Sequence, residues 1–152
     1  MPVKLTTISW LAVAVAVAFG GYAQAADTTG IIKTLQGTVT VERAGAVVPA
    51  QLGLPVVEAD QIVTGSDGTV GITFQDNSLL SLGPNSRLAI DHFKFDSTTH
   101  DGNFETVLKH GKLAVVSGKI AKHKQDAMKV RTPSSILGVR GTEFLVEVMA
   151  AP

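Results

Sequence analysis

Short stretches of alternating polar and apolar residues, separated by turn residues, follow one another through most of this 152-residue chain. In residues 69–75, Val70, Ile72 and Phe74 alternate with polar or smaller residues, as in a half-buried β-strand. After residue 25, no stretch of ten residues carries an uninterrupted apolar stripe at helical spacing. The sequence therefore predicts an all-β fold, arranged as a β-roll or solenoid or as a sandwich. The other predicted strands are 38–42, 61–64, 79–82, 87–90, 106–108, 113–116, 128–131 and 143–148.

The first 25 residues differ in composition from the rest. Lys4 gives a positively charged start, residues 8–19 are almost purely apolar, and residues 23–25 fit a small-residue cleavage site. The apolar run is shorter than the roughly 20 residues that span a bilayer. We therefore predict a signal peptide cleaved between Ala25 and Ala26, and a periplasmic or secreted protein with no membrane span after cleavage. The expected organisation is signal peptide 1–25, lead-in strand 26–36, one all-β domain 37–148 and tail 149–152.

The charges are balanced in total and uneven along the chain. The sequence has 13 basic and 13 acidic residues, but residues 26–108 hold ten acids and four bases, whereas residues 109–131 hold seven bases and one acid. If the fold keeps these regions apart, the surface is polarised and favours oriented docking of a charged partner. The neutral total and the lack of Trp and Tyr after residue 25 argue against a nucleic-acid partner.

The sequence carries no motif typical of a catalytic or metal-binding site. The chain has no cysteine, and its four histidines lack the spacing of a zinc motif. Residues 96–103 only faintly resemble a calcium loop, and Ser117, Ser134 and Ser135 lie outside any nucleophile motif. Glu58 and Asp60 form a pair of the kind that surface strands often carry. We therefore predict no enzyme, no cofactor, and no catalytic or metal-binding residue.

Two polar loops, 96–103 and 117–126, carry few apolar residues, and we expect neither to pack against the core. The second contains the basic residues Lys119, Lys122 and Lys124. These lysines are either a contact for a partner or a solvated loop.

Residues 132–144 differ from the rest of the chain in placing Arg140 between Gly138 and Gly141, after Pro133. An arginine held between turns either ties loops together from a buried position or grips a partner's carboxylate from an exposed one. In the strand that follows, Phe144, Val146 and Val148 are predicted to face one side. Leu113 and Val130 are expected in the core.

The sequence resembles the FecR domain family over about residues 37–148. The resemblance rests on segments 37–41, 60–65, 74–78 and 108–113, and above all on residues 132–144. It implies an all-β domain that binds other proteins in the periplasm without catalysis. Because the chain begins with a predicted signal and ends at Pro152, we expect neither sigma-factor control nor the transducer contact of the family's regulators. The signature residues carried over are Thr132, Pro133, Gly138, Val139, Arg140, Gly141, Thr142 and Phe144, with either a structural or a partner-binding role.

The leading hypothesis is a non-catalytic periplasmic module for protein–protein interaction in envelope signalling or sensing. Its expected partner is another envelope or periplasmic protein. One alternative is a structural or adhesive β-scaffold of the envelope, in which strand edges pair with other chains. Another is a ligand- or metal-binding periplasmic domain.

Overall fold

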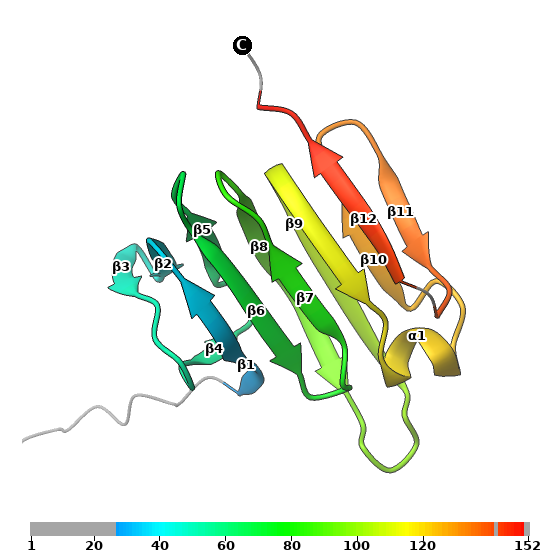
Figure 1. Ribbon diagram of the computed structural model, residues 1–152. Helices are drawn as coiled ribbons and strands as arrows, with labels where there is room; N and C mark the ends of the chain where they lie inside the picture. The colour runs from blue at the N-terminus through cyan, green and yellow to red at the C-terminus, as the bar shows by residue number, and fades with distance from the viewer. Residues whose placement is uncertain (1–26, 142, 151–152) are drawn as a thin grey trace, which may run out of the picture.

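The computed structural model describes residues 27–141 and 143–150. The predicted signal peptide, its cleavage site and Thr142 lie outside these residues. The described chain is nearly all β, with one short helix, α1 (Lys119–His123) (Figure 1). Its strands are β1 (Thr28–Gln36), β2 (Val39–Arg43), β3 (Ala46–Pro49), β4 (Pro55–Val57), β5 (Gln61–Thr64), β6 (Thr69–Phe74), β7 (Leu79–Leu82), β8 (Arg87–Phe95), β9 (Gly102–Val116), β10 (Met128–Arg131), β11 (Ile136–Val139) and β12 (Glu143–Val148).

The strands form one sheet that curls into two facing layers. Along its main path the order is β3-β2-β5-β8-β9-β7-β6-β1-β4. The long strand β9 belongs to both layers: its first part pairs with β8 and β10, and its last part with β7 and β12. All pairs are antiparallel except that of β9 with β10. The fold class predicted from the alternating pattern is confirmed, with a curled sheet as its form.

The two layers enclose an apolar core. Phe74 of β6 lies in one layer and Phe93 of β8 and Phe104 of β9 in the other, with ring centroids 4.5 to 5.6 Å apart. Leu113 and Val130 are fully buried, as predicted. Such aromatic contacts between facing strands hold the layers together without a disulfide.

β9 passes from one layer to the other at Gly111. This residue has a φ of +99°, and a Cβ placed on it would lie 2.1 Å from Oγ of Ser86. Ser86 Oγ in turn accepts a hydrogen bond of 3.0 Å from the Lys112 backbone N–H. Only glycine allows both this backbone conformation and this close approach. The segment 108–113 is therefore a bend within one strand, and the prediction of two separate strands at 106–108 and 113–116 was wrong.

The second polar loop also differs from the expectation. Residues 119–123 form α1, and Ile120 and Ala121 are buried in the core, so the prediction that this loop would not pack was wrong. Ile120 is completely enclosed, and its burial helps to hold so short a helix against the core. In β12, Phe144, Val146 and Val148 face inward while the residues between them are exposed, as predicted.

Candidate interaction surface

A buried polar cluster holds α1 against the turn between β6 and β7. The Asp76 carboxylate accepts hydrogen bonds from Ser78 Oγ at 2.7 Å and from the Ser78 N–H at 3.0 Å. Its backbone carbonyl accepts from the Lys119 N–H at 2.7 Å, and Ser78 Oγ accepts from the Gly118 N–H at 3.0 Å. Asp76 and Ser78 are completely buried. The segment 74–78 that contributes to the family resemblance therefore positions the helix and its lysines.

The basic surface comprises Lys119, Lys122, Lys124 and Arg140. Lys122 and Lys124 are exposed and Lys119 is half-buried. Lys122 lines a surface hollow of about 330 Å³ together with Gln125 and Arg140. The turn between β11 and β12 thus adds Arg140 to Lys119 and Lys122 of α1 and to Lys124, the residue that follows the helix. Among the described residues, none of these four cations has a carboxylate within 4.0 Å.

Arg140 is exposed, which rules out the alternative of a buried arginine. The amide of Gln125 lies against the guanidinium of Arg140. With its oxygen turned toward these donors, Gln125 accepts hydrogen bonds from Arg140, including one of 3.1 Å from Nε. Gln125 was not singled out from the sequence, and a polar residue in a polar loop gives no signal that would have done so. Arg140 is therefore held in place by a neutral side chain and keeps its charge toward solvent.

The other described signature residues lie along β11, in the turns beside it and at the start of β12. Val139 is buried, and Phe144 is partly buried against the core. Thr132 closes the turn before β11, since its Oγ1 accepts from the Ser135 N–H at 3.0 Å. Gly141 has a φ of +71°. Pro133 and Gly138 are exposed, and Thr142 lies outside the described residues.

Several other cations are paired with acids, which reduces the charge separation expected from the sequence. Arg131 lies 3.1 Å from Glu105, and Lys112 lies 3.6 Å from Glu147. Both pairs join the basic segment to acids from other segments. The fold therefore does not keep the acidic and basic regions wholly apart. Besides the four residues of the basic surface, Lys33, Lys94, Lys109 and Lys129 have no carboxylate within 4.0 Å among the described residues.

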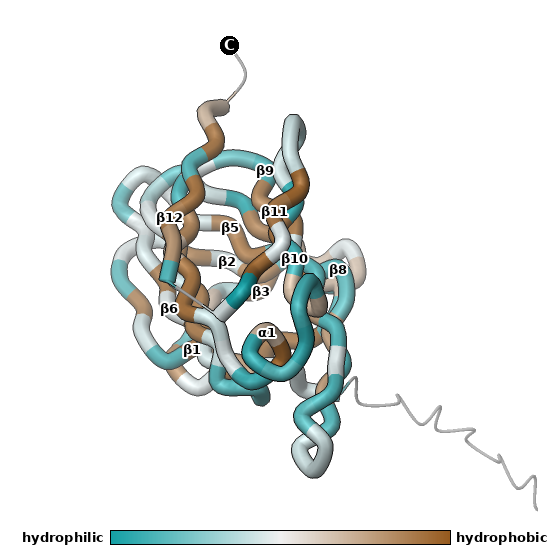
Figure 2. Tube along the Cα trace, turned by 90° about the vertical axis from the view of Figure 1, so that its right-hand side faces the viewer, coloured by the Kyte–Doolittle hydropathy of each residue, from teal (hydrophilic) through white to brown (hydrophobic). Residues whose placement is uncertain are grey.

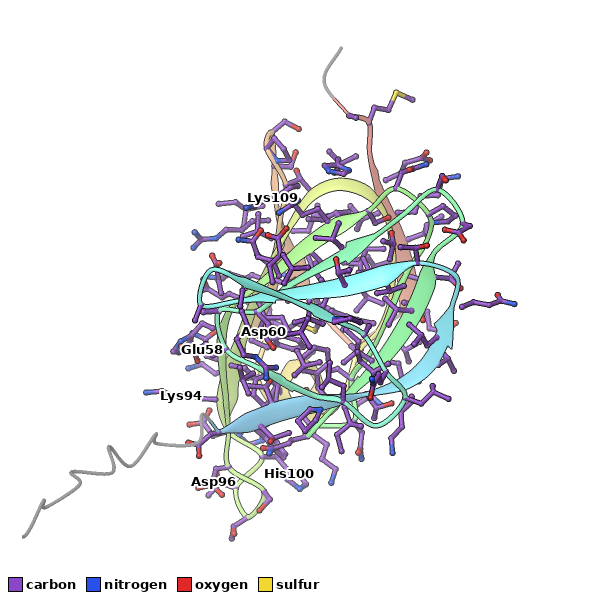
Figure 3. All side chains as sticks on the ribbon, turned by 90° about the vertical axis from the view of Figure 1, so that its left-hand side faces the viewer. Glu58, Asp60, Lys94, Asp96, His100 and Lys109 are labelled. Carbon is purple, nitrogen blue, oxygen red and sulfur yellow. The ribbon has the colours of Figure 1, made fainter. Side chains whose placement is uncertain are left out.

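The carboxylates Glu58 and Asp60 have separate structural roles (Figure 3). Asp60 is completely buried and receives two hydrogen bonds from Arg43, from Nε at 2.8 Å and from a terminal nitrogen at 2.6 Å. These bonds raise the pKa of the Arg43 guanidinium. Glu58 accepts from the Phe93 N–H at 3.1 Å. The two carboxylates are thus engaged with different partners.

The turn between β8 and β9 is closed by its own hydrogen bonds. The Asp96 carboxylate accepts from the backbone N–H groups of Thr98 at 2.8 Å and Thr99 at 3.2 Å, and these bonds lower its pKa. The His100 ring stacks on Phe95, with centroids 6.2 Å apart. Across residues 27–141 and 143–150, no three His, Asp or Glu side chains gather in the way that a metal site requires.

The fold is that of an all-β domain built from one curled sheet. A family model described as FecR protein matches residues 60–151. The match covers more than half of the chain, so the chain belongs to the FecR family, which is envelope-associated and in general regulatory and non-catalytic. Neither the curated proteins nor the solved structures gave a match. Within the described part of the chain, no helix is long and apolar enough to cross a membrane.

Proposed function

We propose that this protein is a non-catalytic module of the bacterial periplasm, which docks an acidic surface of another envelope protein through its basic surface. The observation that carries the proposal is that Lys122 and Arg140 line one surface hollow, with Lys119 and Lys124 close to Lys122 in the sequence. Among the described residues, none of the four has a carboxylate within 4.0 Å. Membership of a regulatory, envelope-associated family supports it.

The arrangement of the four cations suits recognition of carboxylates. Arg140 presents a planar fork of donors, and Gln125 limits its orientation. The backbone at the start of α1 is fixed by the buried pair Asp76 and Ser78, so the helix itself needs little ordering when a partner binds. Exposed cations of this kind mainly accelerate and orient association, and their contribution falls as salt screens it.

The test is crosslinking and pulldown of the native protein from envelope extracts. We expect one specific acidic protein to be recovered, with a yield that falls as ionic strength rises. The variant Lys122→Glu/Arg140→Glu should reduce that yield at least about tenfold, because it reverses two charges at the centre of the surface.

A matched control is Lys33→Glu/Lys109→Glu, which makes the same change in net charge at exposed positions of β1 and β9. The control should retain the partner. Equal recovery by both double variants, or loss by both, would show that the basic surface does not determine binding.

A second candidate function, a self-assembling scaffold, is favoured by one observation. Edge strand β3 exposes all four of its residues, including Val47 and Val48. Such an edge is able to pair with a second chain. Sedimentation over a wide concentration range distinguishes a scaffold from a monomer. A scaffold requires association that Val47→Lys abolishes, whereas a molecular mass that stays monomeric at all concentrations excludes the scaffold function.

A further inference from the structure

The outer edge of β12 is free for pairing. Among the described residues, β12 pairs with β9 alone, and β11 pairs with β10 alone. These two strands form the open side of the curled sheet, as Figure 2 shows from that side. β12 has six residues, two more than β11, and so offers the longer edge.

The hydrogen bonds of Lys112 reveal which backbone groups of β9 point toward β12. The Lys112 carbonyl accepts from the Gly83 N–H at 3.0 Å, and its N–H donates to Ser86 Oγ at 3.0 Å. Both partners lie on the β7 side of β9. Because backbone groups alternate in direction along a strand, those of Leu113 and Val115 point toward β12.

The register then identifies the free groups of β12 itself. Leu113 and Val115 lie opposite Val146 and Phe144, which therefore direct their backbone groups toward β9. Glu143, Leu145 and Glu147 accordingly direct their N–H and C=O groups away from the sheet. The side chains of these three residues are also exposed, that of Leu145 to 68%.

The inner side of this edge is a groove of mixed polar and apolar character. A hollow of about 450 Å³ separates the β10–β11 hairpin from β12. Its apolar lining includes Leu137, Val146, Val148 and Met149, and its polar lining includes Lys109, Ser134, Ser135 and Glu147. Met149 is 85% exposed and Leu137 is 37% exposed. A strand added beside β12 would turn every second side chain toward this groove and cover it.

The charge on β12 selects the chemistry of such a strand. Glu143 and Glu147 flank Leu145 on the same outer face, two residues away on either side. Glu147 also lies 3.6 Å from Lys112 of β9, whereas Glu143 has no cation within 4.0 Å among the described residues. Cross-strand neighbours on one face lie about 5 Å apart, where opposite charges attract. From this geometry, we propose that β12 binds an extended segment of a partner protein by β-strand addition. The segment carries basic residues two positions before and after an apolar residue, with apolar residues between them.

A second copy of the chain fits this edge poorly. In an antiparallel pair centred on Leu145, the Glu143 of each copy would lie opposite the Glu147 of the other. Like charges directly opposite one another destabilise a strand pair. The register that uses the whole strand is thus disfavoured for self-association and favoured for a basic segment.

The probe is the blocked heptapeptide Thr-Lys-Val-Leu-Val-Lys-Thr, added to isotope-labelled protein purified from cells that express the full chain. We expect NMR shift changes in β12 and slower hydrogen exchange of the amides of residues 145 and 147. The same peptide with Glu for Lys, and a scrambled peptide without alternation, should bind at least about tenfold more weakly. Absence of shifts in β12 up to about 1 mM peptide would overturn the proposal.

Two variants test the geometry and the charge separately. Leu145→Pro removes an N–H that faces away from β9, so the fold should persist while peptide binding is lost. Glu143→Lys/Glu147→Lys should reverse the preference in favour of the Glu peptide. Asp91→Lys/Asp101→Lys, at exposed positions outside β12, is the matched charge control and should keep the original preference.

Strand addition at β12 is a second interaction, independent of the proposed docking at the basic surface. Lys122→Glu/Arg140→Glu should leave the heptapeptide affinity within about twofold while it disrupts the acidic partner. If β12 instead mediates concentration-dependent self-association that Leu145→Pro abolishes, its occupant is a second copy and the basic-segment proposal fails.

Discussion

Two arginines of this protein grip a carboxylate in the same way but in different surroundings. Arg43 binds Asp60 through two nitrogens, and Arg87 binds Glu42 through two nitrogens at 2.8 and 3.1 Å. The Asp60 side chain is completely buried, whereas that of Glu42 is 33% exposed. We expect Arg43→Ala to lower the free energy of unfolding by about 3 kcal/mol, because it leaves a buried carboxylate without its counter-ion.

Arg87→Ala is the control, since Glu42 is solvated when its partner is removed. Its expected cost is below about 1 kcal/mol. Urea denaturation of both variants measures the difference, and equal losses would contradict the assigned role of burial.

The sequence around Arg140 does not determine whether this side chain is buried. The pattern of residues 132–144 marks Arg140 as special but is equally compatible with a buried or an exposed side chain. Its exposure depends on α1 and Gln125, which come from a segment more than ten residues earlier. In contrast, the inward direction of Val146 follows from local alternation and was predicted correctly.

Among the elements, the alternating pattern predicted many of the strands but missed β3, β4 and β11 and did not give their order in the sheet. The bounds of β5, β7, β10 and β12 agree with the predicted strands residue for residue. β9 was divided in the prediction because a glycine usually interrupts a strand, whereas here it allows a bend. α1 was missed because its stability comes from distant contacts, with Asp76 and Ser78, rather than from a helical pattern.

Gly118, which directly precedes α1, packs closely against the turn between β6 and β7. A Cβ on Gly118 would lie 2.3 Å from the Asp76 carbonyl oxygen and 2.4 Å from the Ser78 nitrogen, which are both backbone atoms. We expect Gly118→Ala to displace α1 and to cost about 2 kcal/mol. NMR signals of residues 119–123 and urea denaturation measure these effects.

Gly83→Ala is the matched control for this substitution. A Cβ on Gly83 would lie no closer than 3.4 Å to its nearest neighbour, the Cβ of Lys112. The control should keep both the α1 signals and the stability within about 1 kcal/mol of the parent. An undisturbed α1 in Gly118→Ala would mean that the polar cluster does not hold the helix.

At the scale of the whole molecule, the two layers depend on one strand. β9 contributes to both layers, so a change at its bend should affect strands of both, including β5, with which it does not pair. In Gly111→Ala, the added Cβ meets Ser86 and the backbone retains a φ that alanine disfavours. We expect a loss of at least about 2 kcal/mol, distributed equally between β5 in one layer and β7 in the other.

Native-state hydrogen exchange measures the opening free energy of each layer separately. Gly45→Ala separates backbone strain from steric overlap, since Gly45 has a φ of +79° but nothing within 4 Å of an added Cβ. It should cost about 1 kcal/mol. If Gly111→Ala weakened β7 while β5 kept its parental opening free energy, the layers would be independent units. A joint loss instead makes β9 the element through which a strand bound at β12 stabilises the whole domain, because β12 pairs with the same strand.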